Sequence, residues 1–290
     1  MLDEVATVQL VRTQTEDGVR LDGALQTPIQ TNGARQGVVL VHGVGGNFYG
    51  STLLARLAGL LLDLGYVVLR VNTRGHDGVS TASTTQGGRL QGAAYERVDD
   101  CRLDIQAWVR YLVDLDCRHV TLLGHSLGAI KIMYAQAQQP QAEVDRLIAV
   151  SPPRLSFARF RRGNAAAAFD SSLSTAQQWL AEGKPEMLFL ASFPFPLVLS
   201  AATYQDKYGP EEKYNFLKWA DQIHVPIDFI YGGQELSANN SAFDAIEDDI
   251  RQSAWGSTCN VTIIPEANHF YASHPRELSE TVRRIMDQNT

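Results

Sequence analysis

The chain has 290 residues, of which 44% are hydrophobic and 20% are charged, and its formal net charge is −7. This length is enough for a sizeable core, built either as one large domain or as a core with an insertion. An acidic chain without a basic run is a poor candidate for binding nucleic acid or an anionic membrane surface, so we expect no nucleic-acid partner.

The three cysteines, Cys101, Cys117 and Cys259, are an odd number without C-x-x-C spacing. We therefore expect reduced thiols in or near the core, with no disulfide framework and no metal site. Residues 1–5 carry neither the basic segment nor the apolar run of a signal peptide, which predicts a cytoplasmic protein.

No segment predicts a membrane span. The longest stretch without charge, 187–204, contains Pro194 and Pro196, and two prolines argue against a simple spanning helix. This stretch has two open interpretations. It forms either the apolar wall of a ligand pocket or lid, or part of the ordinary packing of the core.

Short apolar runs, which predict buried strands, alternate along the chain with helical hydrophobic patterns. In chain order, the predicted strands are 5–12, 18–26, 37–42, 66–71, 119–124, 146–151, 225–231 and 260–264. The predicted helices are 52–64, 97–115, 126–138, 241–254 and 275–286. This rhythm predicts an α/β fold with a doubly wound, mostly parallel sheet and helices on both faces. Right-handed crossovers place the carboxyl ends of its strands on one edge, where ligands bind.

Between residues 152 and 222 the rhythm breaks. This part, called the inserted segment below, has a helical but no strand-like pattern, and we expect it to fold over the sheet edge. Residues 1–151 and 223–290 would then form the core. The inserted segment offers aromatic side chains that could line a pocket, namely Phe189, Phe193, Phe195, Tyr204 and Trp219.

Residues 124–128 read Gly-His-Ser-Leu-Gly, a G-x-S-x-G motif between a predicted strand and a predicted helix. In that context the central serine stands on a strained turn, with its hydroxyl exposed at the carboxyl end of the sheet. Glycines on both sides let the neighbouring backbone pass without Cβ clashes. Ser126 is therefore the candidate nucleophile, and the competing interpretation is a serine that only caps a helix.

Three motifs in this order resemble the α/β-hydrolase family, and the resemblance covers nearly the whole chain. They are residues 42–46 after a core strand, the turn at Ser126, and His269 just after the last strand. The resemblance implies an α/β-hydrolase fold with an inserted helical cap and the chain order serine, acid, histidine. It also implies that residues 42–46 form the loop of an oxyanion hole.

The family's acid is expected just after the strand that ends at Tyr231, often as G-x-x-D. Here residues 232–235 read G-G-Q-E, so Glu235 replaces the commoner aspartate. The competing carboxylates are Asp228, inside a predicted strand, and Asp244 and Glu247, inside a predicted helix.

His269 is the candidate base, and four other histidines compete with it. His274 precedes a proline and is interpreted as the start of the last helix. His125 is expected on the buried side of the turn, in a packing role. We expect His42 to brace the loop that follows it and His76 to have a structural role in its loop.

Nucleophilic catalysis requires these residue types. A serine hydroxyl is a weak nucleophile until a base takes its proton, and neutral imidazole is a suitable base near neutral pH. A carboxylate orients the imidazole and stabilises the imidazolium ion. Backbone N–H groups must meet the negative charge on the carbonyl oxygen, and the candidates are those of Leu127 and Val44.

These observations predict a serine hydrolase that cleaves a carboxylic ester of an apolar small molecule through an acyl-enzyme. Thioesterase, lactonase or C–C bond hydrolase activity would use the same residues, because the cap chooses the substrate. A non-catalytic ligand-binding protein of the same fold is the alternative from another class. We expect no cofactor, no metal, and a monomer or homodimer; residues 43–46 lack the Lys-Ser/Thr of a phosphate-binding loop.

Overall fold

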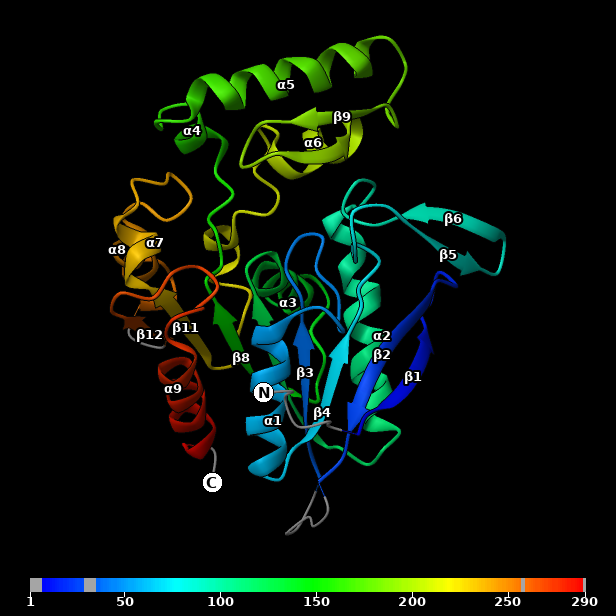
Figure 1. The fold of residues 1–290 in the computed structure, drawn as a ribbon, viewed down its shortest axis with the longest axis vertical. Helices are drawn as coiled ribbons and strands as arrows, with labels where there is room; N and C mark the ends of the chain where they lie inside the picture. Colours follow the sequence, from blue (N-terminus) through cyan, green and yellow to red (C-terminus); the bar gives the residue numbers. More distant parts are fainter. Residues whose placement is uncertain (1–6, 29–34, 257–258, 289–290) are drawn as a thin grey trace.

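The computed structural model describes residues 7–28, 35–256 and 259–288. Eight strands form its central sheet, namely β1 (Gln9–Gln14), β2 (Arg20–Gln26), β3 (Gln36–Val41), β4 (Val67–Val71), β7 (His119–His125), β8 (Val144–Val150), β11 (Ile227–Gly232) and β12 (Cys259–Ile264). Their spatial order is β1-β2-β4-β3-β7-β8-β11-β12. In this spatial order, the six strands from β4 to β12 are parallel to one another. At the other edge, β2 pairs antiparallel with both β4 and β1. The predicted mostly parallel sheet is confirmed (Figure 1).

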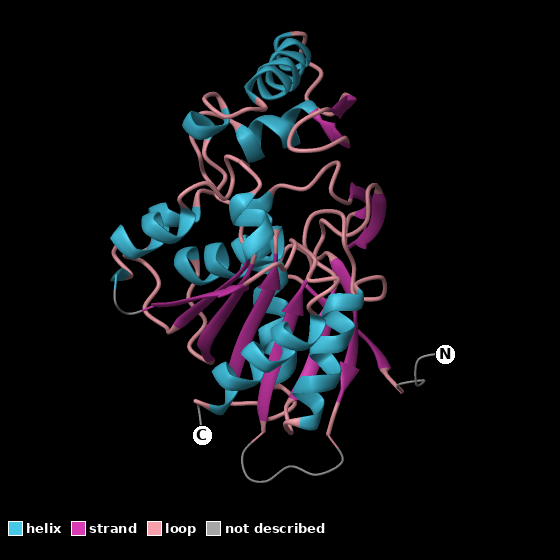
Figure 2. Ribbon diagram, turned by 60° about the vertical axis from the view of Figure 1, so that its left-hand side comes forward, coloured by secondary structure: helices cyan, strands magenta, loops and turns pink. Residues whose placement is uncertain are grey.

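The helices of the core are α1 (Thr52–Asp63), α2 (Cys101–Val113), α3 (Leu127–Gln138), α7 (Gly233–Ser237), α8 (Ile246–Gln252) and α9 (Pro275–Asp287), with the short 3₁₀ helix η1 (Val98–Asp100). Figure 2 shows the strands as one twisted layer with helices packed against it. In β3, Val38 and Leu40 pack with α1 and α9, whereas Val39 and Val41 pack with α2 and α3. Successive side chains of a strand point to opposite faces, so a strand covered on both faces is apolar throughout.

The inserted segment lies over the carboxyl ends of the parallel strands, at the top of Figure 1. It contains α4 (Phe157–Phe160), α5 (Ala166–Ala181), β9 (Leu188–Ala191), β10 (Leu197–Ser200), α6 (Ala201–Tyr208) and the 3₁₀ helix η2 (Phe216–Trp219). The expectation that this segment has no strands is wrong, because β9 and β10 pair as an antiparallel hairpin.

The sequence hides this hairpin because both of its faces are apolar. Ala191 and Leu199 are fully buried on the inner face. Leu190 and Val198 are paired across the strands, and they remain 68% and 43% exposed on the outer face. The alternation of apolar and polar residues that marks a half-buried strand is therefore missing.

A second hairpin was also not predicted. It consists of β5 (Ser80–Thr84) and β6 (Gly87–Gln91), which pair antiparallel beside the main sheet. Its residues are mostly serine, threonine, glycine and glutamine, a composition typical of loops. Only tertiary contacts distinguish such a segment from an irregular connection.

The helix predicted at 241–254 is shorter than expected. It begins at Ile246, because Ala245 has a left-handed backbone with φ 50°. The buried side chain of Arg154 donates hydrogen bonds to the carbonyl oxygens of Ser241 and Asp244, at 3.1 and 2.6 Å. These carbonyl groups are satisfied without a helix, so the turn before α8 is stable.

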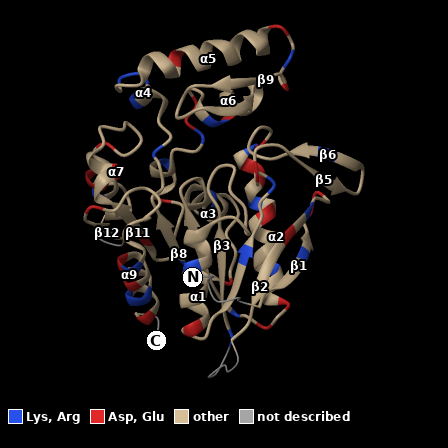
Figure 3. Cartoon of the chain, viewed as in Figure 1, with Lys and Arg blue, Asp and Glu red and all other residues tan. Residues whose placement is uncertain are grey.

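The strand predicted from Val5 begins at Gln9 in the structure, and Val5 itself lies outside the described residues. The three cysteines are buried with free thiols, as predicted. In the described ranges, no helix is long and apolar enough to cross a membrane. Figure 3 shows basic and acidic residues interspersed along α2 and α9.

Candidate active site

Ser126 stands on the turn between β7 and α3 with a strained backbone, φ 57° and ψ −123°. Its N–H donates to the carbonyl oxygen of Val150 at 2.8 Å, which ties the turn to β8. A Cβ at Gly124 would lie 2.3 Å from the carbonyl oxygen of Gly128, and one at Gly128 would lie 2.3 Å from that of Val41. Both flanking glycines are therefore required by close backbone approach.

Glu235 lies in the first turn of α7, directly after β11, and its side chain is buried. Its Oε1 accepts hydrogen bonds from the N–H of Gly232 at 2.7 Å and from the hydroxyl of Ser151 at 2.5 Å. Its Oε2 lies 2.7 Å from Nδ1 of His269. A glutamate three residues into a helix reaches back to the first N–H, as in a capping box. This geometry explains why a glutamate fits here: one oxygen caps α7 while the other faces His269.

His269 lies in the loop after β12, and the acceptor at its Nδ1 is the carboxylate of Glu235. Because a carboxylate only accepts, Nδ1 carries the proton and Nε2 is left as the basic nitrogen. The imidazole ring contacts His125, Phe270 and Phe243, at centroid distances of 4.9, 5.2 and 5.6 Å. The orientation of the ring is thus held by packing as well as by the hydrogen bond.

The neighbouring His125 supports the backbone of this loop. Its Nε2 donates to the carbonyl oxygen of His269 at 2.8 Å. Burial, with the neighbouring His269, lowers the pKa of His125 to about 3, so the ring is neutral near pH 7. Two further competing histidines lie away from this pair: His274 precedes the first residue of α9, and Nδ1 of His76 lies 2.7 Å from the carboxylate of Asp77.

The carboxylates that competed with Glu235 are paired with arginines. Asp228 lies in β11, as expected, and forms an ion pair with Arg146. Glu247 pairs with Arg251 one turn away in α8. Asp244 lies in the turn before α8 and not in a helix, and it pairs with Arg159 at 3.2 Å.

The two residues predicted to supply oxyanion donors, Leu127 and Val44, both lie near Ser126 and line the same cavity. Leu127 is the first residue of α3, and the first N–H groups of a helix have no partner within the helix. Val44 follows Gly43, at which a Cβ would lie 3.1 Å from the Cβ of Ser126. The loop after β3 thus passes close to Ser126.

His42 braces this loop. Its Nδ1 donates to the carbonyl oxygen of Gly43 at 2.7 Å, and its Nε2 accepts from the N–H of Thr73 at 3.1 Å. The N–H of Gly46 donates to the same Gly43 oxygen at 3.1 Å. Burial, with the charge of Lys131 nearby, lowers the pKa of His42 to about 3, so this ring is also neutral near pH 7.

A cavity of about 1190 Å³ lies between the sheet edge and the inserted segment, and Val44, Ser126, Leu127, Glu235 and His269 all line it. No hydrogen bond joins Ser126 to His269 in the described part of the chain.

Glu235 is the only Lys, Arg, Asp or Glu side chain among the described residues that line this cavity. Within the described ranges, no group of three His, Cys, Asp or Glu side chains is arranged to hold a metal ion.

The aromatic lining of the cavity differs in part from the prediction. Phe193 and Phe195 line it as predicted. Phe189, Tyr204 and Trp219 are not among its described lining residues; Tyr204 and Trp219 are buried in the hydrophobic core, and Phe189 packs against that core. The lining contains four further aromatic residues that sequence reasoning did not select, namely Phe160, Tyr208, Phe243 and Phe270.

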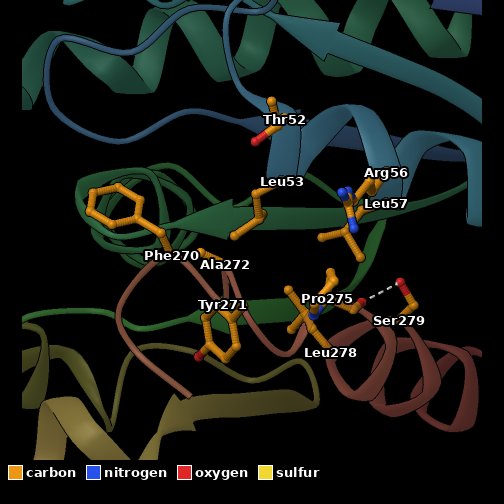
Figure 4. Close-up of a pocket in the computed structure, with 10 residues that line it drawn as sticks. All are labelled: Thr52, Leu53, Arg56, Leu57, Phe270, Tyr271, Ala272, Pro275, Leu278 and Ser279. Carbon is orange, nitrogen blue, oxygen red and sulfur yellow. Dashed lines mark hydrogen bonds between the residues drawn. The ribbon is translucent and has the colours of Figure 1, made fainter. Parts of the chain in front are cut away.

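A smaller cavity of about 150 Å³ lies between α1 and α9 (Figure 4). It shares Thr52, Leu53 and Phe270 with the larger cavity. In Figure 4 the ring of Phe270 lies at the opposite end of the lining from Pro275 and Leu278. These shared side chains therefore form the wall between the two cavities.

Several solved structures share this fold over nearly the whole chain. Est1E from Butyrivibrio proteoclasticus, with ferulic acid bound, is 20% identical, with a TM-score of 0.65 over 95% of this chain and 98% of that one. The esterase Pf2001 of Pyrococcus furiosus is 19% identical, with a TM-score of 0.60 over 97% and 91%. A soluble variant of the monoglyceride lipase of Saccharomyces cerevisiae, in complex with a substrate analog, is 17% identical, with a TM-score of 0.65 over 98% and 97%.

At such identities, these likenesses concern the fold. A search of the curated proteins finds no match to the sequence. Residues 38–281 match the sequence model of the alpha/beta hydrolase family, which extends from β3 into α9 and includes the turn at Ser126, Glu235 and His269. The chain therefore belongs to the alpha/beta hydrolase family.

Proposed function

We propose that this protein is a serine hydrolase that cleaves carboxylic esters of uncharged, apolar small molecules through an acyl-enzyme. The observation that carries the proposal is the hydrogen-bonded pair of Glu235 and His269, 2.7 Å apart, which lines the same cavity as Ser126 on its strained turn. Nucleophile, base and orienting acid are the three roles that acyl transfer requires.

In the proposed reaction, Nε2 of His269 takes the proton of Ser126 as Oγ attacks the ester carbonyl carbon. The N–H groups of Val44 and Leu127 stabilise the negative oxygen of the tetrahedral intermediate. The imidazolium ion then gives its proton to the departing alcohol, which leaves the acyl group on Ser126. A water molecule, activated by the same imidazole, hydrolyses this acyl-enzyme and restores the free hydroxyl group.

The composition of the cavity supports an uncharged substrate. Six aromatic and three leucine side chains, in addition to the residues of the reaction, line it, and Glu235 is the one lysine, arginine, aspartate or glutamate among the lining residues that the structure describes. A carboxylate or phosphate on the substrate would meet no lysine or arginine among these described lining residues and would lie near a negative group, which costs free energy. The lining therefore favours a neutral ester over any thioester, lactone or substrate of C–C bond hydrolysis that would bring a negative charge into the cavity.

We further infer that the inserted segment, residues 152–222, acts as the cap over a core formed by residues 1–151 and 223–290. The segment supplies Phe160, Phe193, Phe195 and Tyr208 to the cavity, whereas the reacting groups come from the core. Such a division lets the cap select the substrate while the core keeps the chemistry.

A fluorophosphonate probe tests the proposal, because it reacts with an activated serine. We expect wild-type protein and the control Ser171→Ala, at an exposed position of α5, to be labelled. Ser126→Ala should remain unlabelled and should lose a factor of about 10⁶ in turnover of p-nitrophenyl esters. Retention of most esterase activity in Ser126→Ala would contradict the mechanism. Failure of the folded wild-type protein to react would favour a non-catalytic binding protein.

A further inference from the structure

Three charged side chains lie together in the interior, between the core and the inserted segment. Glu96, just before η1, lies 2.5 Å from Nζ of Lys131 on α3 and 3.2 Å from Nζ of Lys207 on α6. Each of the three side chains is at most 1% exposed. A buried ion cluster is a weak source of stability, since desolvation of the charges offsets most of their attraction. Stability alone therefore does not explain the cluster, and the contacts of its side chains are the better guide to its role.

The cluster continues into a line of hydrogen bonds that ends at the loop after β3. Nζ of Lys131 donates to the hydroxyl of Thr73 at 2.8 Å. Because the ammonium group can only donate, the Thr73 hydroxyl accepts from it and, together with the N–H of Thr73, directs its own hydrogen toward Nε2 of His42, 3.2 Å from the hydroxyl oxygen. Nδ1 of His42 then donates to the carbonyl oxygen of Gly43 at 2.7 Å. We call Lys131, Thr73, His42 and Gly43 the donor chain.

The last bond of the donor chain acts on the peptide that carries one proposed oxyanion donor. The carbonyl group of Gly43 and the N–H of Val44 belong to the same planar trans peptide. A hydrogen bond that holds the carbonyl oxygen therefore also fixes the direction of the N–H on the opposite side. Hydrogen bonds in series polarise one another, so donation to the Gly43 oxygen makes the Val44 N–H a stronger donor.

We propose that Lys131 and Thr73 are positioning residues for the oxyanion donor at Val44, and that Lys207 extends their network into the inserted segment. The inference rests on the proposed function of the site. Lys131 is buried on α3, the helix that follows Ser126, and its ammonium group contacts none of the proposed catalytic residues in the described part of the chain. The positioning role explains why a lysine lies there. It also makes the inserted segment a support of the oxyanion loop as well as a wall of the cavity.

The charge states fit this arrangement. Burial opposes ionisation of Glu96, but Lys131 and Lys207 outweigh it and lower the pKa of Glu96 to about 2. The pKa of His42, about 3, keeps that ring neutral, so that Nε2 accepts while Nδ1 donates. The donor chain therefore keeps one direction at neutral pH.

Thr73→Val tests the inference, because it removes the hydroxyl from the donor chain at nearly constant shape and leaves the ion cluster in place. We expect kcat for a neutral p-nitrophenyl ester to fall about tenfold, less than the 10²–10³ lost with an oxyanion donor itself, while KM stays near the wild-type value. Thr73→Ser, which keeps the hydroxyl, should restore most of the activity. Thr281→Val, at a buried threonine of α9, is the matched control and should keep wild-type kcat.

A second readout separates positioning from general loosening of the fold. A boronic acid that forms a tetrahedral adduct with the serine should bind Thr73→Val more weakly, by the same factor as the loss in kcat/KM. Lys131→Met should act in the same direction as Thr73→Val. Lys207→Met should act less strongly, because Lys207 reaches Thr73 only through Glu96 and Lys131.

Each outcome separates the inference from the proposed function. Wild-type kcat in Thr73→Val, in a protein whose Ser126 still reacts with the fluorophosphonate, would overturn the positioning role and leave the hydrolase intact. Equal losses in Thr73→Val and Thr73→Ser would also overturn it, since the hydroxyl would then be irrelevant. Absence of Ser126-dependent ester hydrolysis in the wild-type protein would overturn the proposed function, and the inference with it.

Discussion

The hydroxyl of Ser151 donates a hydrogen bond to Oε1 of Glu235, on the side of the carboxylate away from His269. Ser151 follows β8, is fully buried, and has a left-handed backbone with φ 50°. Its oxygen also lies 2.8 Å from the hydroxyl of Tyr271, whose single hydrogen is shared between the Ser151 oxygen and the carbonyl oxygen of Ile230, 3.2 Å away. The carboxylate of the proposed acid is therefore held by Ser151, by the N–H of Gly232 and by His269, which come from three parts of the chain.

This contact predicts that Ser151→Ala lowers kcat by about tenfold, equivalent to about 1.4 kcal/mol, with little change in KM. The carboxylate would keep the N–H of Gly232 and His269 but lose one donor that fixes its plane. Tyr271→Phe should cost less, because that hydroxyl reaches Glu235 only through Ser151. Steady-state kinetics on one neutral ester measure both effects. A larger loss in Tyr271→Phe than in Ser151→Ala would contradict this order.

The glutamate itself can be tested by shortening it. Glu235→Asp keeps the charge, but its carboxylate cannot reach both the N–H of Gly232 and Nδ1 of His269. We expect kcat to fall between the wild-type value and that of Glu235→Gln. The Gln variant should lose about 10⁴ in kcat, by analogy with replacement of the acid in other triads, and less than Ser126→Ala. Wild-type kcat in Glu235→Gln would show that another carboxylate is the acid.

The two neutral buried histidines predict a loss of stability in mild acid. Burial, with His269 for His125 and Lys131 for His42, lowers both pKa values from 6.5 to about 3. Below pH 6.5 the unfolded chain therefore takes up protons that the folded chain does not, so the free energy of unfolding falls as pH falls from 6.5 toward 3. Each histidine should lower the free energy of unfolding by about 1 kcal/mol between pH 7.5 and 5.5.

Urea unfolding at pH 7.5 and 5.5 measures this effect. His125→Phe should reduce the difference in unfolding free energy between the two pH values by about 1 kcal/mol, whatever its effect on absolute stability. Phe270→Leu alters a ring that contacts His125 at 5.7 Å without removing a titrating group, so it should keep the wild-type pH dependence. An unchanged pH dependence in His125→Phe would show that the ring is charged or exposed in the folded protein.

The lining of the cavity predicts discrimination by substrate charge. The p-nitrophenyl monoester of succinic acid carries a carboxylate, and we expect its kcat/KM to be at least about tenfold lower than that of p-nitrophenyl butyrate. The methyl ester of the same succinate removes the charge and should recover most of the difference. Asn164→Arg places a cation at the cavity and should narrow the ratio between charged and neutral esters. Equal rates for the charged and neutral esters would contradict an uncharged substrate class.

Much of the fold could be predicted from the sequence, because the relevant patterns are local. The apolar run of β3 marks a strand buried on both faces, and the glycines at 124 and 128 mark a tight turn around Ser126. The hairpin of β9 and β10 escaped prediction, since its outer face is apolar and exposed. The turn before α8 escaped it too, because buried Arg154 satisfies carbonyl groups that a helix would otherwise use.

The sequence by itself determined the family resemblance, the candidate residues Ser126, Glu235 and His269, and their order, because strand runs and turn glycines act over a few residues. Only the tertiary structure decided what surrounds them. The hydrogen bond between Lys207 and Glu96 joins residues 111 positions apart, and that between Ser151 and Tyr271 joins residues 120 apart. Hydrogen bonds depend on donor and acceptor approaching within about 3 Å at a suitable angle. No spacing of residue types along the chain encodes that approach, because the packing of the sheet, its helices and the inserted segment creates it.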